Sequence, residues 1–409
     1  MRLKINNNVL ILSQVFHPDS TAVAQHVTDL AVDLAAAGFD VTVLTSRRCY
    51  DNPQKLYASN EIYKDIKITR LPITKFGKKT KWSRIFDAVI FFVSVFWYLL
   101  TCKKFEIIIG VTSPPLIAFP CAIYNLFRGG LFIYWIMDMN PDLAIQAGLI
   151  KRDSFLSYIL EGISRFCFRQ SSHIIVLDRF MQQRIINKGI DHQKITISPP
   201  WSYYDVIHCI DHEKNPFRVK YNLTDKFVIM YSGNHSIVHS LDTLLETALK
   251  LKNDSRYIFL FIGWGVGVKK VVDFKQKHLL KNIIYLTTQP IDELSYSLSA
   301  ADLHVIVMGN DLVGIVHPCK IYGVLTVGRP FVFIGPETSH VGDIISIYEI
   351  GHQIKHGQPE RLIDVIYTID GLKDREKDII AQKSVEIVKN SHSRQLLSNA
   401  VISIIRQTK

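Results

Sequence analysis

Short runs of β-branched residues alternate with helical patterns along the chain, and this alternation limits the fold more than any other feature of the sequence. In the first half, apolar runs predict strands at residues 8–13, 41–45, 107–111, 131–136 and 174–177. An amphipathic pattern predicts a helix over residues 22–37 that ends at Gly38, a residue type that commonly follows the last helical turn. Strands and helices at this spacing indicate parallel βαβ units.

The second half repeats the same arrangement. Its apolar runs predict strands at residues 227–231, 257–262, 283–286, 303–307 and 331–334, separated by helices that include residues 241–251 and 291–301. These runs are rich in Val, Ile and Phe, as expected for parallel strands that are buried on both faces. The expected linker is the segment 198–215, which contains Pro199 and Pro200 and shows little periodicity.

We therefore expect an α/β protein with two facing Rossmann-like domains, at residues 1–200 and 201–390. A chain of 409 residues is long for a single core and suits two such domains. The composition, 48% hydrophobic and 21% charged, is typical of a globular protein rather than a disordered one. Each parallel sheet presents a ligand crevice at the carboxyl ends of its strands, so two ligands can meet where the domains face each other.

The formal net charge of +11 is compatible with nucleic acid, an anionic membrane or an anionic substrate as a partner. Five basic residues with no acid among them precede the most apolar stretch of the chain, residues 85–100: Lys75, Lys78, Lys79, Lys81 and Arg84. This order favours a membrane surface over nucleic acid. The sequence also lacks any recognised nucleic-acid module, so we expect no nucleic-acid partner.

The apolar stretch 85–100 contains Asp87 and is shorter than the roughly 20 apolar residues of a spanning helix. We expect residues 85–100 to form a helix that lies in the membrane interface, and the segment from Lys75 to Leu100 to bind the anionic membrane surface. A true membrane span and a buried helix of the first domain are the alternatives.

The six cysteines form no CxxC pair and indicate free thiols. Without a signal-peptide pattern, we expect the body of the protein to face the cytoplasm.

Two turns that follow predicted strands contain glycine. In the first turn, Ser232, Gly233 and Asn234 enter a predicted helix, whose amino end favours phosphate; an ordinary βα turn is the alternative. In the second turn, Gly263 and Gly265 permit a ligand to approach the backbone. The spacing of the second turn does not match the full GxGxxG pattern of dinucleotide-binding dehydrogenases.

His235 and His239 are four residues apart, as in zinc pairs on one helix face. No third ligand is evident, so we expect no metal there. We expect His239 to contact a phosphate, and a surface histidine is the alternative.

The segment His317-Pro318-Cys319-Lys320 follows a polar loop and opens a predicted helix. A lysine in the first turn of a helix is unfavourable for the helix dipole unless an anion binds there. We therefore expect Lys320 to hold a diphosphate and to take part in catalysis. The alternative is a solvated surface lysine.

Asp138 and Asp142 follow the predicted strand 131–136, and carboxylates at the carboxyl end of a strand are well placed for a cleft. We expect them to orient an acceptor hydroxyl or to act as a base. A simple helix cap is the alternative for either residue. The sequence offers no DxD pair for metal chelation at this site.

With these residues in place, the chain resembles family 4 of the GT-B glycosyltransferases, and within it the subgroup that builds bacterial O-antigen, colanic acid and related surface polysaccharides. The resemblance extends over nearly the whole chain. The matching segments are residues 14–18, 135–142, 231–234, 239–246, 318–323 and 328–330.

The resemblance implies a GT-B fold in which a C-terminal helix at residues 391–409 returns to the first domain. It implies a nucleotide-sugar donor, usually UDP-linked, in the second domain, with Val316, Pro318 and Tyr322 joining the donor-binding residues above. It implies an acceptor in the first domain, so Gln14 and His17 join Asp138. It also implies transfer with retention, no metal and no cofactor, on a polyprenyl-diphosphate-linked saccharide at the cytoplasmic face of the inner membrane.

The chain departs from the family at several positions. The two glutamates that the family usually carries are replaced by Ile315 and Gly323, and the usual basic pair for the diphosphate by Asn234 and His239. Backbone amides at residues 313–316 are candidates for some of the missing contacts. Two other functions stay open: a UDP-sugar epimerase or hydrolase of the same fold, and a non-catalytic membrane-bound partner of another transferase.

Overall fold

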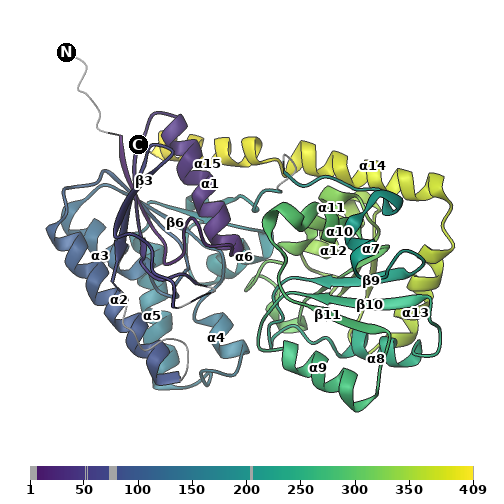
Figure 1. Ribbon diagram of the computed structural model, residues 1–409. Coiled ribbons are helices and arrows are strands. Elements are labelled where there is room, and N and C mark those ends of the chain that lie inside the picture. The colour runs from purple at the N-terminus through teal and green to yellow at the C-terminus, as the bar shows by residue number, and fades with distance from the viewer. Residues whose placement is uncertain (1–6, 51, 53, 73–80, 203–205, 409) are drawn as a thin grey trace. The chain divides into compact units, whose positions relative to one another are not determined.

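The computed structural model divides the chain into two compact units (Figure 1). It describes residues 7–50, 52, 54–72, 81–202 and 206–408, without the side chains of residues 81–88. Unit 1 comprises residues 1–199, 314–316 and 397–409, and unit 2 comprises residues 200–313 and 317–396. The division after Pro199 lies at the start of the segment predicted as the linker. The C-terminal helix begins at Arg394, although unit 1 takes in only the part of it from Leu397 onward.

Within its described residues, unit 1 contains a sheet in the strand order β3-β4-β2-β1-β5-β6-β7-β8. The strands are β1 (Asn8–Leu12), β2 (Asp40–Ser46), β3 (Asn60–Tyr63), β4 (Ile66–Leu71), β5 (Ile107–Gly110), β6 (Leu131–Trp135), β7 (His173–Val176) and β8 (Ile195–Ile197). All neighbours pair in parallel except β3 and β4, which form an antiparallel hairpin.

The five predicted strands of this half are confirmed, and each predicted end lies within one residue of the observed end. The sequence pattern missed β8, which pairs beyond β7. The sequence pattern also missed β3 and β4. β3 is mostly exposed and β4 mixes charged with apolar residues, so neither resembles a strand that is buried on both faces.

The helices of unit 1 are α1 (Ala22–Ala36), α2 (Lys81–Thr101), α3 (Ala118–Arg128), α4 (Asp142–Gln146), α5 (Phe155–Gln170), α6 (Arg179–Asn187), η2 (His192–Lys194) and α15 (Arg394–Thr408). Side chains of α2, α3, α5 and α6 share one core against the sheet. The last turn of α15 reaches the end of α1, where Arg406 Nη2 donates to the Ala37 carbonyl. Gly38 follows α1 with a φ of 91°, which confirms its predicted place after the helix.

Unit 2, as far as the structure describes it, has a wholly parallel sheet in the order β11-β10-β9-β12-β13-β14. The strands are β9 (Phe227–Ser232), β10 (Tyr257–Ile262), β11 (Ile283–Leu286), β12 (Leu303–Val307), β13 (Phe331–Ile334) and β14 (His352–Ile354). The five predicted strands are confirmed here, and four of them have the predicted bounds. β14 was missed because it has only three residues, two of them polar.

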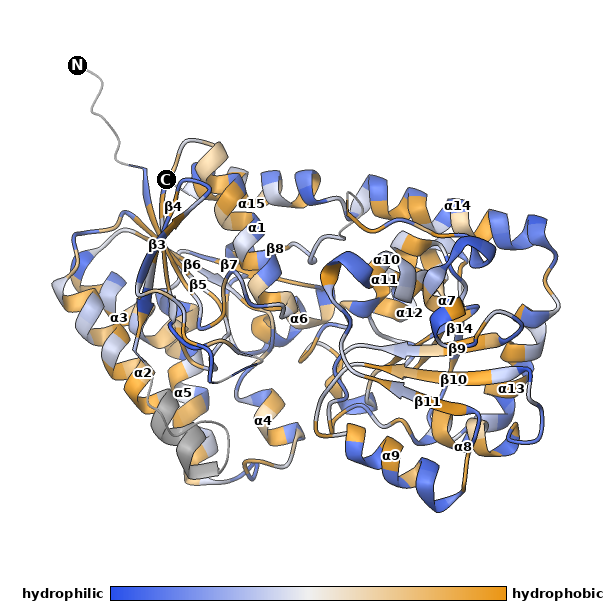
Figure 2. Cartoon of the chain, in the orientation of Figure 1, coloured by the Kyte–Doolittle hydropathy of each residue, from blue (hydrophilic) through white to orange (hydrophobic). Residues whose placement is uncertain are grey.

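The helices of unit 2 are η3 (His212–Lys214), α7 (Pro216–Lys220), α8 (Asp242–Lys250), α9 (Val268–Lys277), η4 (Ile291–Glu293), α10 (Leu294–Ser299), η5 (Asn310–Leu312), α11 (Lys320–Val327), α12 (His340–Tyr348), α13 (Pro359–Asp370) and α14 (Asp374–Ser391). Side chains of α8, α9 and α13 pack on one face of the sheet, and those of α7 and α10 pack on the other. Helix α14 is largely hydrophilic along its length (Figure 2).

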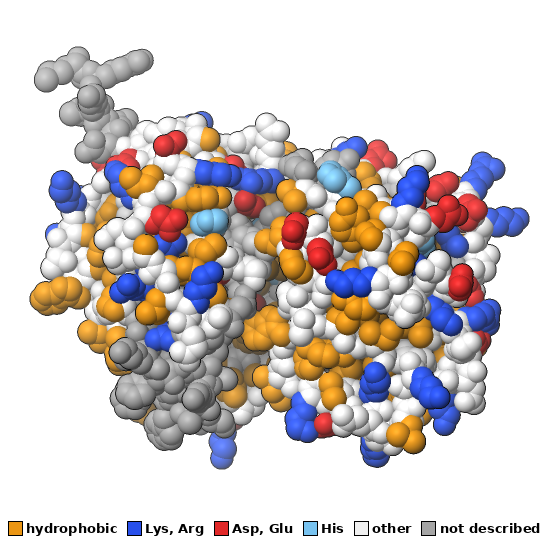
Figure 3. Space-filling view, viewed as in Figure 1, with side chains coloured by type: hydrophobic (Ala, Val, Ile, Leu, Met, Phe, Trp, Pro, Cys, Tyr) orange, Lys and Arg blue, Asp and Glu red, His pale blue; other side chains and the backbone are white. Residues whose placement is uncertain are grey.

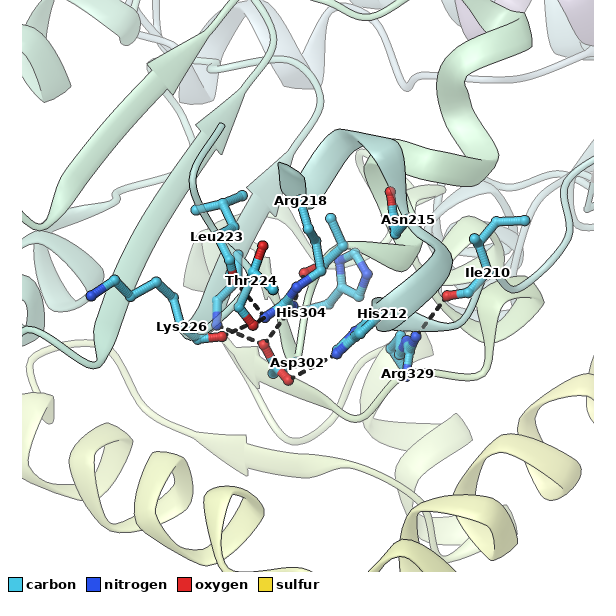
Figure 4. A network of polar contacts seen from close by, with 12 residues as sticks. Ile210, His212, Asn215, Arg218, Leu223, Thr224, Lys226, Asp302, His304 and Arg329 are labelled. Carbon is cyan, nitrogen blue, oxygen red and sulfur yellow. Dashed lines mark hydrogen bonds and ion pairs between the residues drawn. The ribbon is translucent and has the colours of Figure 1, made fainter. Parts of the chain in front are cut away.

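A buried arginine ties the start of unit 2 to its sheet (Figure 4). Arg218, on α7, pairs with Asp302 at 3.0 Å and donates to the carbonyls of Ala300 and Leu223. Asp302 also accepts a hydrogen bond from the backbone amide of Val228, at the start of β9. A buried guanidinium is stable only when its donors find such partners, so this network fixes the amino ends of β9 and β12 to α7.

The basic charge does not form one continuous track on the face that Figure 3 shows, where Lys and Arg side chains lie scattered among acidic and neutral ones. That distribution does not suggest a groove for a nucleic-acid backbone on this face. Among the helices that the structure describes, none combines the length and the apolar character needed to cross a membrane.

Candidate donor and acceptor sites

The loops after β9 and β10 bind each other through their backbones. The His235 amide donates to the Trp264 carbonyl at 2.8 Å, and the Gly267 amide donates to the His235 carbonyl at 2.8 Å. The glycines are required for this approach, because a Cβ at Gly263 would lie 2.0 Å from the Gly233 carbonyl oxygen. Thus the two glycine turns predicted separately from the sequence, 232–235 and 263–267, form one structural element at the carboxyl end of the sheet.

Lys320 lies at this element. It is the first residue of α11, which confirms its predicted place at a helix start. Its ammonium lies 3.6 Å from the centre of the Tyr231 ring, and Nζ donates to the Asn234 carbonyl at 3.4 Å. The ion pairs found among the described residues do not include Lys320, so its charge is stabilised there by a ring face and a carbonyl rather than by a carboxylate.

The surroundings of Lys320 disfavour positive charge. Burial lowers the pKa of Lys320 to about 7. Burial, followed by the charge of Lys320, lowers the pKa of His235 to about 4 and that of His239 to about 3, with His356 contributing to the latter. A buried charge without a counter-ion is costly, and an anionic ligand would relieve that cost.

Both histidines keep one ring nitrogen available within the described part of the chain. His235 Nδ1 contacts the Gly233 carbonyl at 3.0 Å, while its Nε2 is buried and has no hydrogen-bond partner there. Nδ1 of His239 is likewise buried and unsatisfied among the described residues. A buried ring nitrogen of this kind can form a hydrogen bond with a bound ligand. The sequence assigned His235 no role beyond the rejected zinc pair, and the structure places it close enough to Lys320 for the lysine charge to lower its pKa.

The remaining donor candidates divide into two groups. Ser232, Gly233, Asn234, Gly263, Gly265 and Pro318 belong to the loops around Lys320, at the carboxyl ends of β9, β10 and β12. Val316 instead groups with unit 1, where it packs against the core that includes Ile315. Tyr322 is on α11, but its hydroxyl is buried between His317 at 2.7 Å and His340 at 2.9 Å. The Tyr322 hydroxyl thus already has hydrogen-bond partners within unit 2, and a donor contact of Val316 or Tyr322 stays a prediction.

The acceptor candidates of unit 1 gather at the carboxyl end of its sheet. The Gln14 amide donates to the Ser113 carbonyl at 2.7 Å, and the Asp138 amide donates to Oγ1 of Thr112 at 3.2 Å. The short segment after β5 therefore connects the loop after β1 with the loop after β6. This connection brings together two of the three predicted acceptor residues, which are far apart in the sequence.

Asp142 belongs to an ion-pair cluster of unit 1. Its carboxylate pairs with Lys188 at 3.0 Å, and Lys188 also pairs with Glu161 at 2.7 Å. Asp142 is the first residue of α4, where a negative charge favours the helix dipole. These contacts give Asp142 a structural role in unit 1.

Comparisons with known proteins agree with this architecture. A family model described as a glycosyl transferase 4-like domain matches residues 21–201. The chain is 24% identical over 295 residues to WbjE of Pseudomonas aeruginosa, named as a glycosyltransferase, with 70% of this chain and 72% of that protein covered. It is 23% identical over 351 residues to WcaI of Escherichia coli K12, named as a glycosyl transferase of colanic acid biosynthesis, with coverage of 83% and 86%.

The chain is a glycosyltransferase of GT-B fold, and its residues 21–201 match the glycosyl transferase 4-like domain. Its fold is similar to that of Anabaena HepE, whose crystal structure holds UDP and glucose. The TM-score is 0.73 at 13% identity, and the alignment covers 98% of this chain and 99% of HepE. The two parallel sheets predicted from the sequence are thus the two Rossmann-like domains of this fold class.

The β3–β4 hairpin adds contacts around the predicted acceptor residue His17 that the sequence did not reveal. Tyr63 stacks on the ring of His17, with 3.9 Å between ring centres. Arg70, which is buried, pairs with Glu61 at 2.6 Å and donates to the His17 carbonyl at 2.9 Å. These residues fix the predicted acceptor residue His17. Because both strands of the hairpin were missed, its contacts could not be predicted.

Proposed function

We propose that this glycosyltransferase moves a hexose, with retention of configuration, from a UDP-linked donor to a polyprenyl-diphosphate-linked saccharide during synthesis of a bacterial surface polysaccharide. The observation that carries the donor assignment is the half-buried Lys320 side chain, whose ammonium lies over the Tyr231 ring and has no carboxylate partner among the described residues. The name of WcaI and the UDP bound to HepE support the product class and the nucleotide.

In the proposed reaction, Lys320, His239 and Asn234 receive the diphosphate as it leaves the sugar. Negative charge grows on the leaving oxygen in the transition state, so donors already placed there lower the barrier most effectively. Lys320 supplies the compensating positive charge, Asn234 and the neutral imidazole of His239 supply hydrogen bonds, and the proposed reaction uses neither a metal nor a cofactor. The acceptor hydroxyl attacks the same face of the sugar, and we assign its orientation to Asp138.

The experiment for this proposal is a panel of nucleotide sugars offered with a lipid-diphosphate-linked sugar acceptor, with products read by mass spectrometry. We expect an acceptor product that is one hexose heavier. Nuclear magnetic resonance should show that the transferred hexose keeps the anomeric configuration that it has in the donor. Free sugar without acceptor product would instead indicate a hydrolase, and an isomerised nucleotide sugar would indicate an epimerase. If no nucleotide or nucleotide sugar binds in calorimetry, the proposed donor site is wrong and a non-catalytic role is favoured.

We also propose that unit 1 binds the anionic surface of the inner membrane from the cytoplasmic side. Helix α2 buries one face, at Phe91, Val95 and Leu99, and exposes a second apolar face. The exposed residues are spaced four and three apart: Val89, Val93, Trp97, which is 70% exposed, and Leu100. A continuous apolar stripe on the outside of a helix, flanked by basic residues, is typical of helices that lie in the membrane interface.

The start of α5 provides a second apolar group in unit 1. Phe155 is 82% exposed, and Leu149, Leu156, Tyr158 and Ile159 are also exposed. Lys151 and Arg152 are exposed beside them, so basic charge accompanies this apolar group as well. Lys75, Lys78 and Lys79 of the predicted basic cluster lie outside the described residues, and so do the side chains of Lys81 and Arg84.

Vesicle flotation tests the membrane proposal. We expect the wild type to float with vesicles that contain phosphatidylglycerol and to float less with pure phosphatidylcholine, because basic residues add attraction to anionic lipid. Trp97→Ser and Phe155→Ser should each reduce flotation. Ile347→Ser, which alters an exposed apolar residue of unit 2, is the matched control and should not. Equal flotation of the wild type and both unit 1 variants would contradict the proposed surface.

A further inference from the structure

Tyr322 is buried in unit 2 between two imidazoles. Its hydroxyl lies 2.7 Å from Nε2 of His317 and 2.9 Å from Nε2 of His340. A phenol has one proton, so with neutral imidazoles it donates to one ring and accepts an N–H from the other. The three side chains thus connect the turn before α11, helix α11 itself and the first turn of α12.

Further contacts hold the same helix. The Tyr322 ring packs against the ring of His392, with 4.9 Å between their centres. One turn later on α11, Thr326 donates to the Tyr322 carbonyl at 2.6 Å and shares a buried hydrogen bond with Ser202. The start of α11 is therefore fixed on several sides by groups within unit 2.

We propose that Tyr322, held by His317 and His340, is the positioning residue that places Lys320 for the donor diphosphate. Lys320 lies between His317 and Tyr322 in the sequence, and the Cys319 amide donates to the His317 carbonyl at 2.9 Å within the same turn. Fixing both ends of this short turn fixes the direction in which the lysine leaves it. This inference rests on the proposed donor site.

The chemistry of the three groups suits this task. A carboxylate used to hold the turn would attract the lysine ammonium and compete with the diphosphate. A phenol and imidazoles can hold the turn through hydrogen bonds while leaving the charge of Lys320 for a ligand. The positions where the family usually carries glutamates are here Ile315, which is buried, and Gly323, which follows Tyr322 directly.

The test compares Tyr322→Phe with the wild type by calorimetric titration with UDP. The substitution keeps the ring that packs on His392 and removes only the hydroxyl. We expect UDP affinity to fall about tenfold, the change that a free-energy loss of about 1.4 kcal/mol produces. Tyr348→Phe, which removes another hydroxyl of unit 2, 3.5 Å from Ser391, is the matched control and should bind UDP as the wild type does.

A double-mutant cycle separates positioning from general stability. If Tyr322 acts through Lys320, Tyr322→Phe should weaken UDP binding in the wild type but add nothing in a Lys320→Met background. Equal losses in both backgrounds would overturn the inference, and so would unchanged affinity of Tyr322→Phe. His340→Leu serves as a second variant with the same expectations if Tyr322→Phe does not fold. Absence of UDP binding to the wild type would instead refute the donor site on which the inference rests.

Discussion

The Cα of Gly233 faces the side chain of Lys320 so closely that a Cβ at this position would lie 2.6 Å from the lysine Cε. The glycine thus provides the space in which the lysine side chain reaches the Tyr231 ring. The relationship explains why a glycine follows β9 here: it also has a φ of 123°, which other residues rarely adopt.

Gly233→Ala should therefore displace Lys320 as well as strain the backbone. We expect a loss of UDP affinity together with a lower melting temperature, measured by calorimetry. Gly189→Ala is the matched control, because Gly189 also has a positive φ, of 85°, but a Cβ added there would meet no atom within 4 Å. The control should lose stability while UDP affinity stays unchanged. Normal UDP binding by Gly233→Ala would contradict the contact with Lys320.

Donor binding should depend on pH through Lys320. Its pKa of about 7 in the folded protein means that the ammonium, which attracts the diphosphate, is lost as the pH rises through 7. We expect UDP-glucose affinity to fall between pH 6 and pH 9, with proton uptake on binding above pH 7, measured by calorimetry in buffers of different ionisation enthalpy. Lys320→Arg should flatten this profile, because arginine stays charged.

The same pKa shift predicts an effect on stability with a defined sign. Between about pH 7 and the ordinary lysine pKa near 10.4, the unfolded chain holds a proton at this site that the folded chain has lost. The wild type is therefore penalised at neutral pH, and the penalty disappears toward pH 10. Lys320→Met should melt at a higher temperature than the wild type at pH 7, with a smaller difference near pH 10. A pH-independent difference would contradict the depressed pKa of Lys320.

Asp138 and Asp142 should respond differently to the same substitution. Asp138→Asn is expected to lower turnover by about 100-fold or more if the carboxylate orients or deprotonates the acceptor hydroxyl. Asp142→Asn should mainly lower the melting temperature, because it weakens the ion pair with Lys188. Turnover at saturating substrates and thermal unfolding together decide between them. Similar turnover losses in both variants would indicate that the Asp142 carboxylate also takes part in catalysis.

Loss of Arg218 should lower the free energy of unfolding of unit 2 more than loss of an exposed arginine. Arg218→Met leaves Asp302 and several carbonyl oxygens without their donor, and breaking a buried pair costs about 3–5 kcal/mol. Arg256→Met is the control, because Arg256 pairs with Asp254 at the surface, where a pair contributes about 0–1 kcal/mol. Chemical unfolding of the two variants measures the difference. Equal destabilisation would show that the buried network is not the stronger restraint.

The sequence predicted the buried parallel strands and the helix that begins at Lys320, because both depend on local pattern and on helix-dipole physics. It could not predict the hairpin that carries Tyr63 and Arg70, since its strands are exposed or of mixed polarity. It also could not predict the ion pair of Asp142, because only the fold places Lys188 beside that carboxylate. The burial of the Tyr322 hydroxyl likewise depends on His340, which is eighteen positions away in the chain.

The turnover of Lys320→Met, measured with the donor and acceptor pair that the wild type uses, tests the central claim most directly. We expect turnover at saturating donor to fall by about 100-fold or more, the loss associated with removing one electrostatic donor from a transition state. Lys281→Met, at an exposed lysine of the same unit, is the matched control and should be unaffected. Turnover of Lys320→Met close to that of the wild type would contradict the role of Lys320 in holding the leaving diphosphate.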